Sequence, residues 1–259
     1  FDFGNLASLH MLDTRLIGRD QQVTLDQYLS GLANAPTRQL MGATQSDWLT
    51  ARMAASGATW QVLGQQVLMA RMHIPLSVAS SITPETLAEF TAALATPEAA
   101  RTDSQRALLA QQRVPYNLDA WDGYPAARET VLAAARTQGK NLISLAGDTH
   151  NMWGANLTDA SGQRVGVEFG TSSISSPGFE TRLPLIADTV LADAFLKMVA
   201  DLRFAQTSKR GYVVLTLTPA EARGDWIEVS TVFSHSYSTR VTASRRVLPG
   251  PANLDLIPA

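Results

Sequence analysis

Residues 141–153, which read NLISLAGDTHNMW, have the residue types and spacing that best suit chemistry in this chain. An apolar strand is predicted to end at Gly147, and Asp148 and His150 follow it directly. In layered α/β folds the carboxyl ends of strands line the ligand crevice, and a glycine there allows the backbone to turn sharply. We therefore expect the side chains of Asp148 and His150 to enter a binding crevice.

These two side chains suit metal ions or phosphate. Residues two apart share one face of an extended segment, so Asp148 and His150 should point the same way. A carboxylate oxygen beside an imidazole nitrogen suits two dissimilar metals. The sequence thus predicts Asp148 and His150 as metal ligands and as the catalytic pair. The alternative is structural, with Asp148 capping a turn and His150 an ordinary half-buried histidine.

The composition describes an ordinary globular chain with one large core. Of its 259 residues, 45% are hydrophobic and 17% are charged, and the net charge is -2. This charge provides no basic excess, so we expect no nucleic-acid-binding surface. No apolar stretch approaches the roughly 20 residues that a transmembrane helix needs. Because the chain has no cysteine, any metal must be held by oxygen or imidazole ligands.

The hydrophobic patterns predict an α/β architecture with a mixed sheet. Strands are predicted at residues 6–12, 59–69, 141–146, 164–169, 211–217 and 226–233, the last two joined by residues 219–224. Helices are predicted at residues 44–56, 125–138 and 186–202, and two more begin at the Thr-Pro-Glu sequences 83–85 and 96–98. A long surface loop is expected at residues 171–178. Without repeats or linkers, residues 1–259 form one domain or part of one.

Five motifs, in order along the chain, resemble those of the PhoD-like alkaline phosphatases. They are LDTR at 12–15, ATWQVLGQQV at 58–67, WDGYP at 121–125, GDTH at 147–150, and VEFGT with SSPG between 167 and 178. This family belongs to the calcineurin-like metallophosphoesterases, whose last metal motif is usually Gly-His-x-His. The PhoD branch replaces the first histidine of that motif with aspartate, the position of Asp148 here.

The resemblance implies a fold and an activity. The chain would be the C-terminal half of a layered α/β/β/α metallophosphoesterase sandwich with mixed sheets. The reaction would be hydrolysis of phosphate mono- or diesters by attack of metal-bound hydroxide on phosphorus. By the same resemblance, His150 would bind Fe3+ and Asp148 would bind Ca2+, which prefers oxygen ligands. Family members are typically exported, so a periplasmic or extracellular location is expected.

Three further residues are candidates for substrate binding. Asn151 could donate to a phosphate oxygen, although asparagine after a strand commonly belongs to a turn. Arg15 in LDTR could contact substrate, or could form a structural pair with Asp13. Asp122 in WDGYP could contact substrate, or could bond its own backbone within a turn. The sequence leaves these alternatives open.

Part of the family's metal site is absent from residues 1–259. The other metal motifs of the family precede the LDTR strand, and the chain begins at Phe1 without an initiator methionine. We therefore expect the N-terminal half of the same enzyme, as a lost segment or a separate chain, to supply the remaining ligands. Two alternatives are a phospholipase D-like hydrolase of the same family and a non-catalytic binding fragment.

Overall fold

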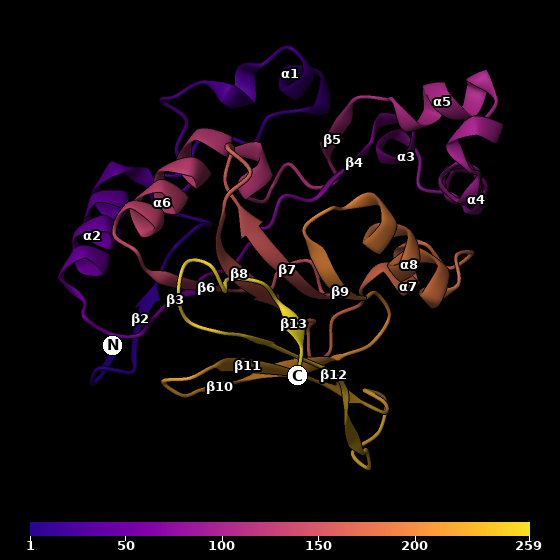
Figure 1. Cartoon of the computed structure of the whole chain (residues 1–259). Coiled ribbons are helices and arrows are strands. Elements are labelled where there is room, and N and C mark those ends of the chain that lie inside the picture. Colours follow the sequence, from indigo (N-terminus) through magenta and orange to yellow (C-terminus); the bar gives the residue numbers. More distant parts are fainter.

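The computed structural model describes residues 1–259 and is built around a seven-stranded mixed sheet (Figure 1). In spatial order its strands are β1 (Asp2–Phe3), β2 (Ala7–Met11), β3 (Trp60–Gly64), β6 (Asn141–Ala146), β8 (Arg164–Gly170), β7 (Met152–Thr158) and β9 (Leu202–Gln206). The four inner strands β2, β3, β6 and β8 run parallel, so their carboxyl ends meet at one edge. The strands β1, β7 and β9 pair antiparallel with their neighbours.

A smaller antiparallel sheet covers one face of the large sheet. Its strands are β10 (Gly211–Leu217), β11 (Ala222–Val229), β12 (Thr239–Val247) and β13 (Ile257–Pro258). Trp60, Phe169 and Val167 of the large sheet pack with Trp226 of β11 in a buried cluster between the two sheets. A third sheet is the pair β4 (His73–Pro75) and β5 (Arg113–Pro115).

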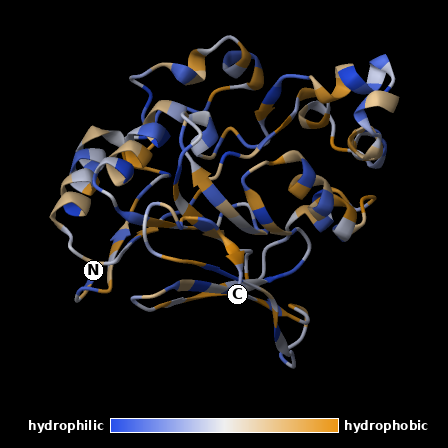
Figure 2. Cartoon of the chain, viewed as in Figure 1, coloured by the Kyte–Doolittle hydropathy of each residue, from blue (hydrophilic) through white to orange (hydrophobic).

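Helices cover the opposite face of the large sheet, chiefly α2 (Gly42–Ala55), α6 (Pro125–Thr137) and α8 (Asp188–Met198), whose buried side chains enter the main core. The other helices are α1 (Leu25–Leu29), η1 (Leu32–Asn34), α3 (Leu76–Ser80), α4 (Pro84–Ala95), η2 (Glu98–Ala100), α5 (Asp103–Leu109), η3 (Trp121–Gly123) and α7 (Phe179–Arg182). The longer helices carry both hydrophilic and hydrophobic residues, as amphipathic helices do (Figure 2). None of the helices has the length and apolar character needed to cross a membrane.

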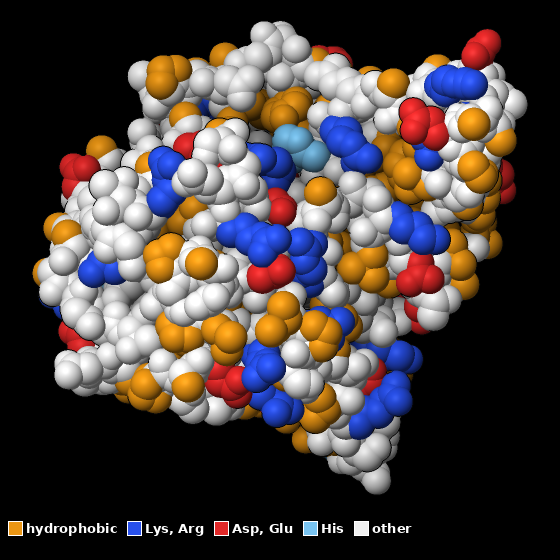
Figure 3. Space-filling view, in the orientation of Figure 1, with side chains coloured by type: hydrophobic (Ala, Val, Ile, Leu, Met, Phe, Trp, Pro, Cys, Tyr) orange, Lys and Arg blue, Asp and Glu red, His pale blue; other side chains and the backbone are white.

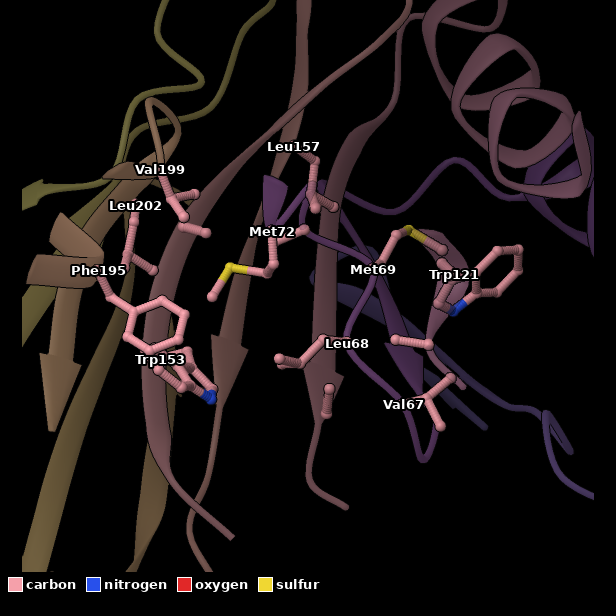
Figure 4. Close-up of a cluster of buried hydrophobic side chains, with 14 of the residues drawn as sticks. Val67, Leu68, Met69, Met72, Trp121, Trp153, Leu157, Phe195, Val199 and Leu202 are labelled. Atoms are coloured by element: carbon pink, nitrogen blue, oxygen red, sulfur yellow. The ribbon is translucent and has the colours of Figure 1, made fainter. Parts of the chain in front are cut away.

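The helical layer and the sheet enclose the main core. It contains Leu49 of α2, Leu132 of α6 and Phe195 of α8, together with the apolar side chains of residues 67–72. Figure 4 shows Trp153 and Phe195 side by side in this core, with ring centroids 5.2 Å apart. The layers are therefore helices, large sheet and small sheet, and the predicted α/β fold with mixed sheets is confirmed.

Several predicted elements are confirmed closely. The strands Asn141–Ala146 and Gly211–Leu217 have the predicted bounds. The strands predicted at 6–12 and 164–169 and the helix predicted at 125–138 each agree within one residue at either end. Thr83 caps α4 as expected, because its side chain accepts a hydrogen bond from the backbone N–H of Thr86. Residues 171–178 contain no helix or strand, as predicted for a loop.

Other predictions are wrong in their bounds. The strand predicted at 59–69 ends at Gly64, because the next segment donates backbone hydrogen bonds to the buried Glu168 carboxylate instead of to a strand. The strand predicted at 226–233 begins at Ala222, and the turn before it is closed by a bond from Thr218 N–H to the Glu221 carbonyl. The helix predicted at 186–202 is α8 alone, and Leu202 begins β9.

The Thr-Pro-Glu sequence at 96–98 starts only the short η2. The following helix α5 begins after Thr102, whose side chain accepts a bond from the Gln105 N–H. The patterns also missed three strands of four or more residues, β7, β9 and β12.

On the face shown in Figure 3, basic side chains are scattered, with acidic ones beside several of them. The charge pattern there is mixed and does not form one basic stripe.

Candidate functional site

The GDTH motif forms a tight loop at the carboxyl end of β6. The N–H of Gly147 donates to the Gln66 carbonyl over 2.9 Å, and the N–H of Thr149 donates to the Gly147 carbonyl over 2.7 Å. Asp148 and His150 have φ angles of +63° and +60°, and no other non-glycine residue of the chain has a positive φ. Left-handed backbone at such residues costs about 1–2 kcal/mol each and is concentrated at functional sites.

The expectation of an extended segment here is therefore wrong, because residues 147–151 turn sharply. The loop nevertheless brings Asp148 and His150 to one cavity of about 490 Å³. The residues that line the cavity come from four separate stretches of the chain and are Ile82, Tyr116, Asn117, Asp119, Asp148, Thr149, His150, Asn151, Gly178, Phe179 and Arg182. Most of them are polar, which suits a charged ligand.

His150 has the geometry of a ligand with one nitrogen already used. Its Nδ1 lies 2.9 Å from the Pro177 carbonyl oxygen. Because a carbonyl can only accept, Nδ1 donates this bond, and in the neutral imidazole Nε2 then has a lone pair available to a cation. A metal-binding histidine commonly donates its second ring N–H to a carbonyl in this way, which holds the ring in place.

Asp148 leaves its carboxylate free of hydrogen bonds from the protein. Its nearest cationic partner is the Arg15 guanidinium, at 3.9 Å, and its side chain is 30% exposed. Asp148 and His150 together offer oxygen and imidazole donors that fit part of a metal site. No group of three or more histidine, cysteine, aspartate or glutamate side chains in the chain is arranged to hold a metal ion. The two residues would therefore need further ligands.

Arg15 reaches the edge of the cavity through Asp119. The Asp119 carboxylate accepts hydrogen bonds from both Arg15 and Arg19. The bond to Asp119 raises the pKa of Arg15, so Arg15 remains a cation beside Asp148. The structural pair with Asp13 does not form, because that carboxylate accepts the backbone N–H groups of Arg15 and Leu16 at 2.9 and 2.8 Å.

The structure assigns Asn151 and Asp122 mainly structural contacts. Asn151 lines the cavity, but its Nδ2 donates to the Thr149 carbonyl at 2.6 Å and its Oδ1 accepts from the Phe179 N–H at 3.3 Å. Asp122 is buried away from the cavity and accepts the Met72 N–H over 2.7 Å. The predicted substrate contact by Asp122 is therefore not supported by the geometry, and Asn151 serves the turn.

For several cavity residues, nothing in the adjacent sequence indicates that they belong to the site. Tyr116, Asn117 and Asp119 follow the short strand β5, and Phe179 and Arg182 lie on α7 after the loop 171–178. The position of α7 directly after the SSPG motif is the only hint that the sequence offers. These residues reach the site because the fold brings distant segments to the end of β6.

Comparisons with known proteins agree on one family. A model of the PhoD-like phosphatases matches residues 1–226. Alkaline phosphatase D of Bacillus subtilis (strain 168) is 31% identical over 264 residues, an overlap that covers 95% of this chain and 38% of that protein. A solved structure titled "Structure of PhoD" superposes with a TM-score of 0.72 at 27% identity and covers 100% of this chain and 43% of that one. The chain spans less than half the length of these relatives, and it belongs to the PhoD-like phosphatase family.

Proposed function

We propose that this chain forms part of a metal-dependent hydrolase of phosphate mono- or diesters, of the alkaline phosphatase D type. The observation that carries the proposal is the pair Asp148 and His150. Both line one cavity, one with a free carboxylate and the other with a free Nε2, within the motif that resembles the last metal motif of the family. Membership of the family supports the same reaction class.

The residues of the chain have distinct roles in this proposal. The bond from His150 Nδ1 to the Pro177 carbonyl holds the ring, so that Nε2 can bind Fe3+. The Asp148 carboxylate suits Ca2+. When bound, these cations would neutralise phosphoryl oxygens and lower the pKa of a water molecule. In the net reaction phosphorus gains the hydroxyl of water, the P–O bond to the alcohol breaks, and the remaining proton of water goes to the alcohol. Arg15 adds positive charge beside Asp148.

Two donors do not complete a catalytic metal centre, which commonly has three protein ligands or more. We propose that the remaining ligands come from the N-terminal half of the same enzyme, in one continuous chain or as a separate one. The relatives support this, because this chain spans only 38% of alkaline phosphatase D from B. subtilis. A periplasmic or extracellular location is proposed from the family alone.

The test combines kinetics with elemental analysis of the enzyme that carries these residues. Wild type should hydrolyse p-nitrophenyl phosphate or bis(p-nitrophenyl) phosphate and contain iron and calcium. Asp148→Ala should lower kcat roughly 100-fold or more and reduce the calcium content. Asp26→Ala, a change of another exposed aspartate far along the chain, is the matched control and should retain activity. Full activity of Asp148→Ala would exclude a metal-ligand role for Asp148.

The two alternatives differ in their outcomes. Release of choline from phosphatidylcholine would assign the phospholipase D-like reaction. Binding of phosphate without any hydrolysis, in a sample that contains both metals, would assign a non-catalytic fragment.

A further inference from the structure

The cavity at Asp148 and His150 also has an apolar wall. Three of its lining residues, Ile82, Tyr116 and Phe179, are half-buried hydrophobic side chains that pack against the main core. A site for inorganic phosphate alone would have no use for such a surface. At about 490 Å³ the cavity has room for a phosphate group and an organic group of the size of a ring.

Neighbouring aromatic rings hold this apolar wall in place. The Tyr116 ring lies 6.1 Å from Phe179 and 5.5 Å from Phe195, measured between ring centroids. Phe179 stacks on Phe195 at 5.8 Å, and Trp153 lies 6.4 Å from Tyr116. Aromatic pairs at these separations stabilise each other beyond the area they bury. The wall is therefore formed before any ligand arrives.

A charged group in the same cavity is suited to a phosphoryl group. Arg182 lines the cavity and is exposed. A guanidinium binds phosphoryl oxygens through charge-assisted hydrogen bonds. The hydroxyl oxygen of Tyr116, by contrast, is covered by the protein, so Tyr116 contributes its ring to the cavity and not its hydroxyl.

The apolar wall is tied directly to the metal-motif loop. The Phe179 N–H donates to Asn151 Oδ1 over 3.3 Å, and the carbonyl of Pro177 holds His150. Gly178 lies so close that an added Cβ would be 2.7 Å from both Asn151 Oδ1 and the His150 carbonyl oxygen. On the other side, Glu180 forms an ion pair with Arg210, the residue directly before β10. The helix α7, which carries Phe179 and Arg182, is thus held between the loop and the small sheet.

We infer that this cavity selects phosphate esters whose alcohol is aromatic or bulky and apolar. Ile82, Tyr116 and Phe179 form the subsite for the organic group. Arg182 contacts the phosphoryl oxygens. The inference rests on the proposed phosphate-ester hydrolysis and adds the class of alcohol that the site accepts.

Two phosphonates that cannot be hydrolysed test the subsite. Phenylphosphonate and methylphosphonate share the charged group and differ only in the organic group. Titration calorimetry on the complete enzyme should show phenylphosphonate binding about tenfold more tightly than methylphosphonate, because burying about half of the ring contributes that much binding free energy. Phe179→Ala should remove most of this preference and leave methylphosphonate binding unchanged within about twofold. Binding can also be followed by the fluorescence of Trp153, which lies beside Tyr116.

Further variants separate the polar contacts from the apolar ones. Arg182→Gln should weaken both phosphonates by a similar factor of about ten. Tyr116→Phe keeps the ring and removes only the covered hydroxyl, so it should change neither affinity by more than about twofold. Phe179→Leu provides a second test of the wall if Phe179→Ala is poorly folded. Phe233→Ala is the matched control, since Phe233 is 96% exposed and lies outside the cavity.

The outcomes distinguish the subsite from the proposed function. Equal affinity of the wild type for both phosphonates would overturn the subsite, and so would an equal loss of both in Phe179→Ala. Hydrolysis of p-nitrophenyl phosphate by the same wild-type enzyme would still support the proposed function. An enzyme that hydrolyses this ester but binds no phenylphosphonate also overturns the subsite. Absence of both hydrolysis and phosphonate binding would overturn both proposals.

Discussion

Two loops leave the same edge of the large sheet, and they use acidic residues in opposite ways. The loop after β3, residues 65–72, is mostly buried, and its Met69 and Ala70 N–H groups donate to Glu168 at 2.7 and 2.8 Å. The loop after β6, residues 147–151, is more exposed and carries Asp148, whose carboxylate accepts no hydrogen bond from the protein. Glu168 accepts hydrogen bonds at both carboxyl oxygens, whereas Asp148 accepts none.

The difference shows how one sheet edge combines rigidity with reactivity. Gln66 in the buried loop accepts the Gly147 N–H through its carbonyl and the Thr14 N–H and hydroxyl through Oε1 at 2.7 Å. The buried loop therefore supports both the GDTH loop and the segment that carries Arg15. Carboxyl oxygens that already accept three bonds are occupied in fixing the backbone, while an unbonded carboxylate is available to a cation.

The largest expected effect separates activity from stability at the exposed loop. His150→Asn should lower kcat for p-nitrophenyl phosphate roughly 100-fold or more, because Nε2 is lost as a metal ligand. Asparagine tolerates a positive φ, so the backbone should keep its turn. The free energy of unfolding in urea should change by less than about 1 kcal/mol. A large loss of stability with retained activity would reverse the roles assigned to the two loops.

The buried loop should respond in the opposite way. Glu168→Gln places an amide NH2 where the carboxylate accepts from Met69, Ala70 and Ser144, so one donor is left unsatisfied. At pH 4.5 we expect the free energy of unfolding to fall by about 1–3 kcal/mol. Glu221→Gln, which breaks a half-exposed pair with Arg246, is the control and should change it by less than about 1 kcal/mol. Equal effects of the two variants would contradict the structural role of Glu168.

The same residue predicts a pH dependence of stability. Burial raises the pKa of Glu168 to about 7, against the opposing hydrogen bonds from Met69, Ala70 and Ser144. Because the folded pKa exceeds the unfolded value of 4.5, the contribution is complete below pH 4.5 and is lost as the pH rises through 7. Between these pH values the free energy of unfolding should therefore fall by on the order of 3 kcal/mol more in the wild type than in Glu168→Gln. Urea unfolding at a series of pH values measures this difference, and parallel curves for the two proteins would refute it.

The local hydrophobic pattern was enough to predict the elements that consist of continuous apolar runs. The strand β6 is one such run and ends at a glycine, so its bounds were predicted correctly. The strand β7 was missed because Gly154 and Asn156 interrupt its apolar pattern. In the structure Gly154 packs closely against Trp226, and the Asn156 side chain bonds Asp255 and the Leu256 N–H. The residues that explain these interruptions are distant in sequence.

The candidate site shows the same difference between residues marked by a local motif and residues brought in by the fold. Asp148 and His150 were predicted from one local motif, and both lie at the cavity. Tyr116 and Arg182 were not predicted, because nothing adjacent in sequence marks them and only the fold brings β5 and α7 to the end of β6. The conformation of the motif was also not predicted. The prediction assumed an extended segment, in which alternate residues share one face, whereas Asp148 and His150 both have positive φ angles.

The smallest expected effect tests that turn directly. At Asp148, φ is +63°, a region that glycine enters without strain and alanine does not. Asp148→Gly should therefore be more stable than Asp148→Ala by about 1 kcal/mol, although both lose the carboxylate. Thr149, whose φ is not positive, is the matched control, and there the glycine variant should be the less stable of the two by about 0.5–1 kcal/mol. Thermal unfolding of the four variants measures both differences, and the same sign at the two positions would show that the strain at Asp148 is not present in solution.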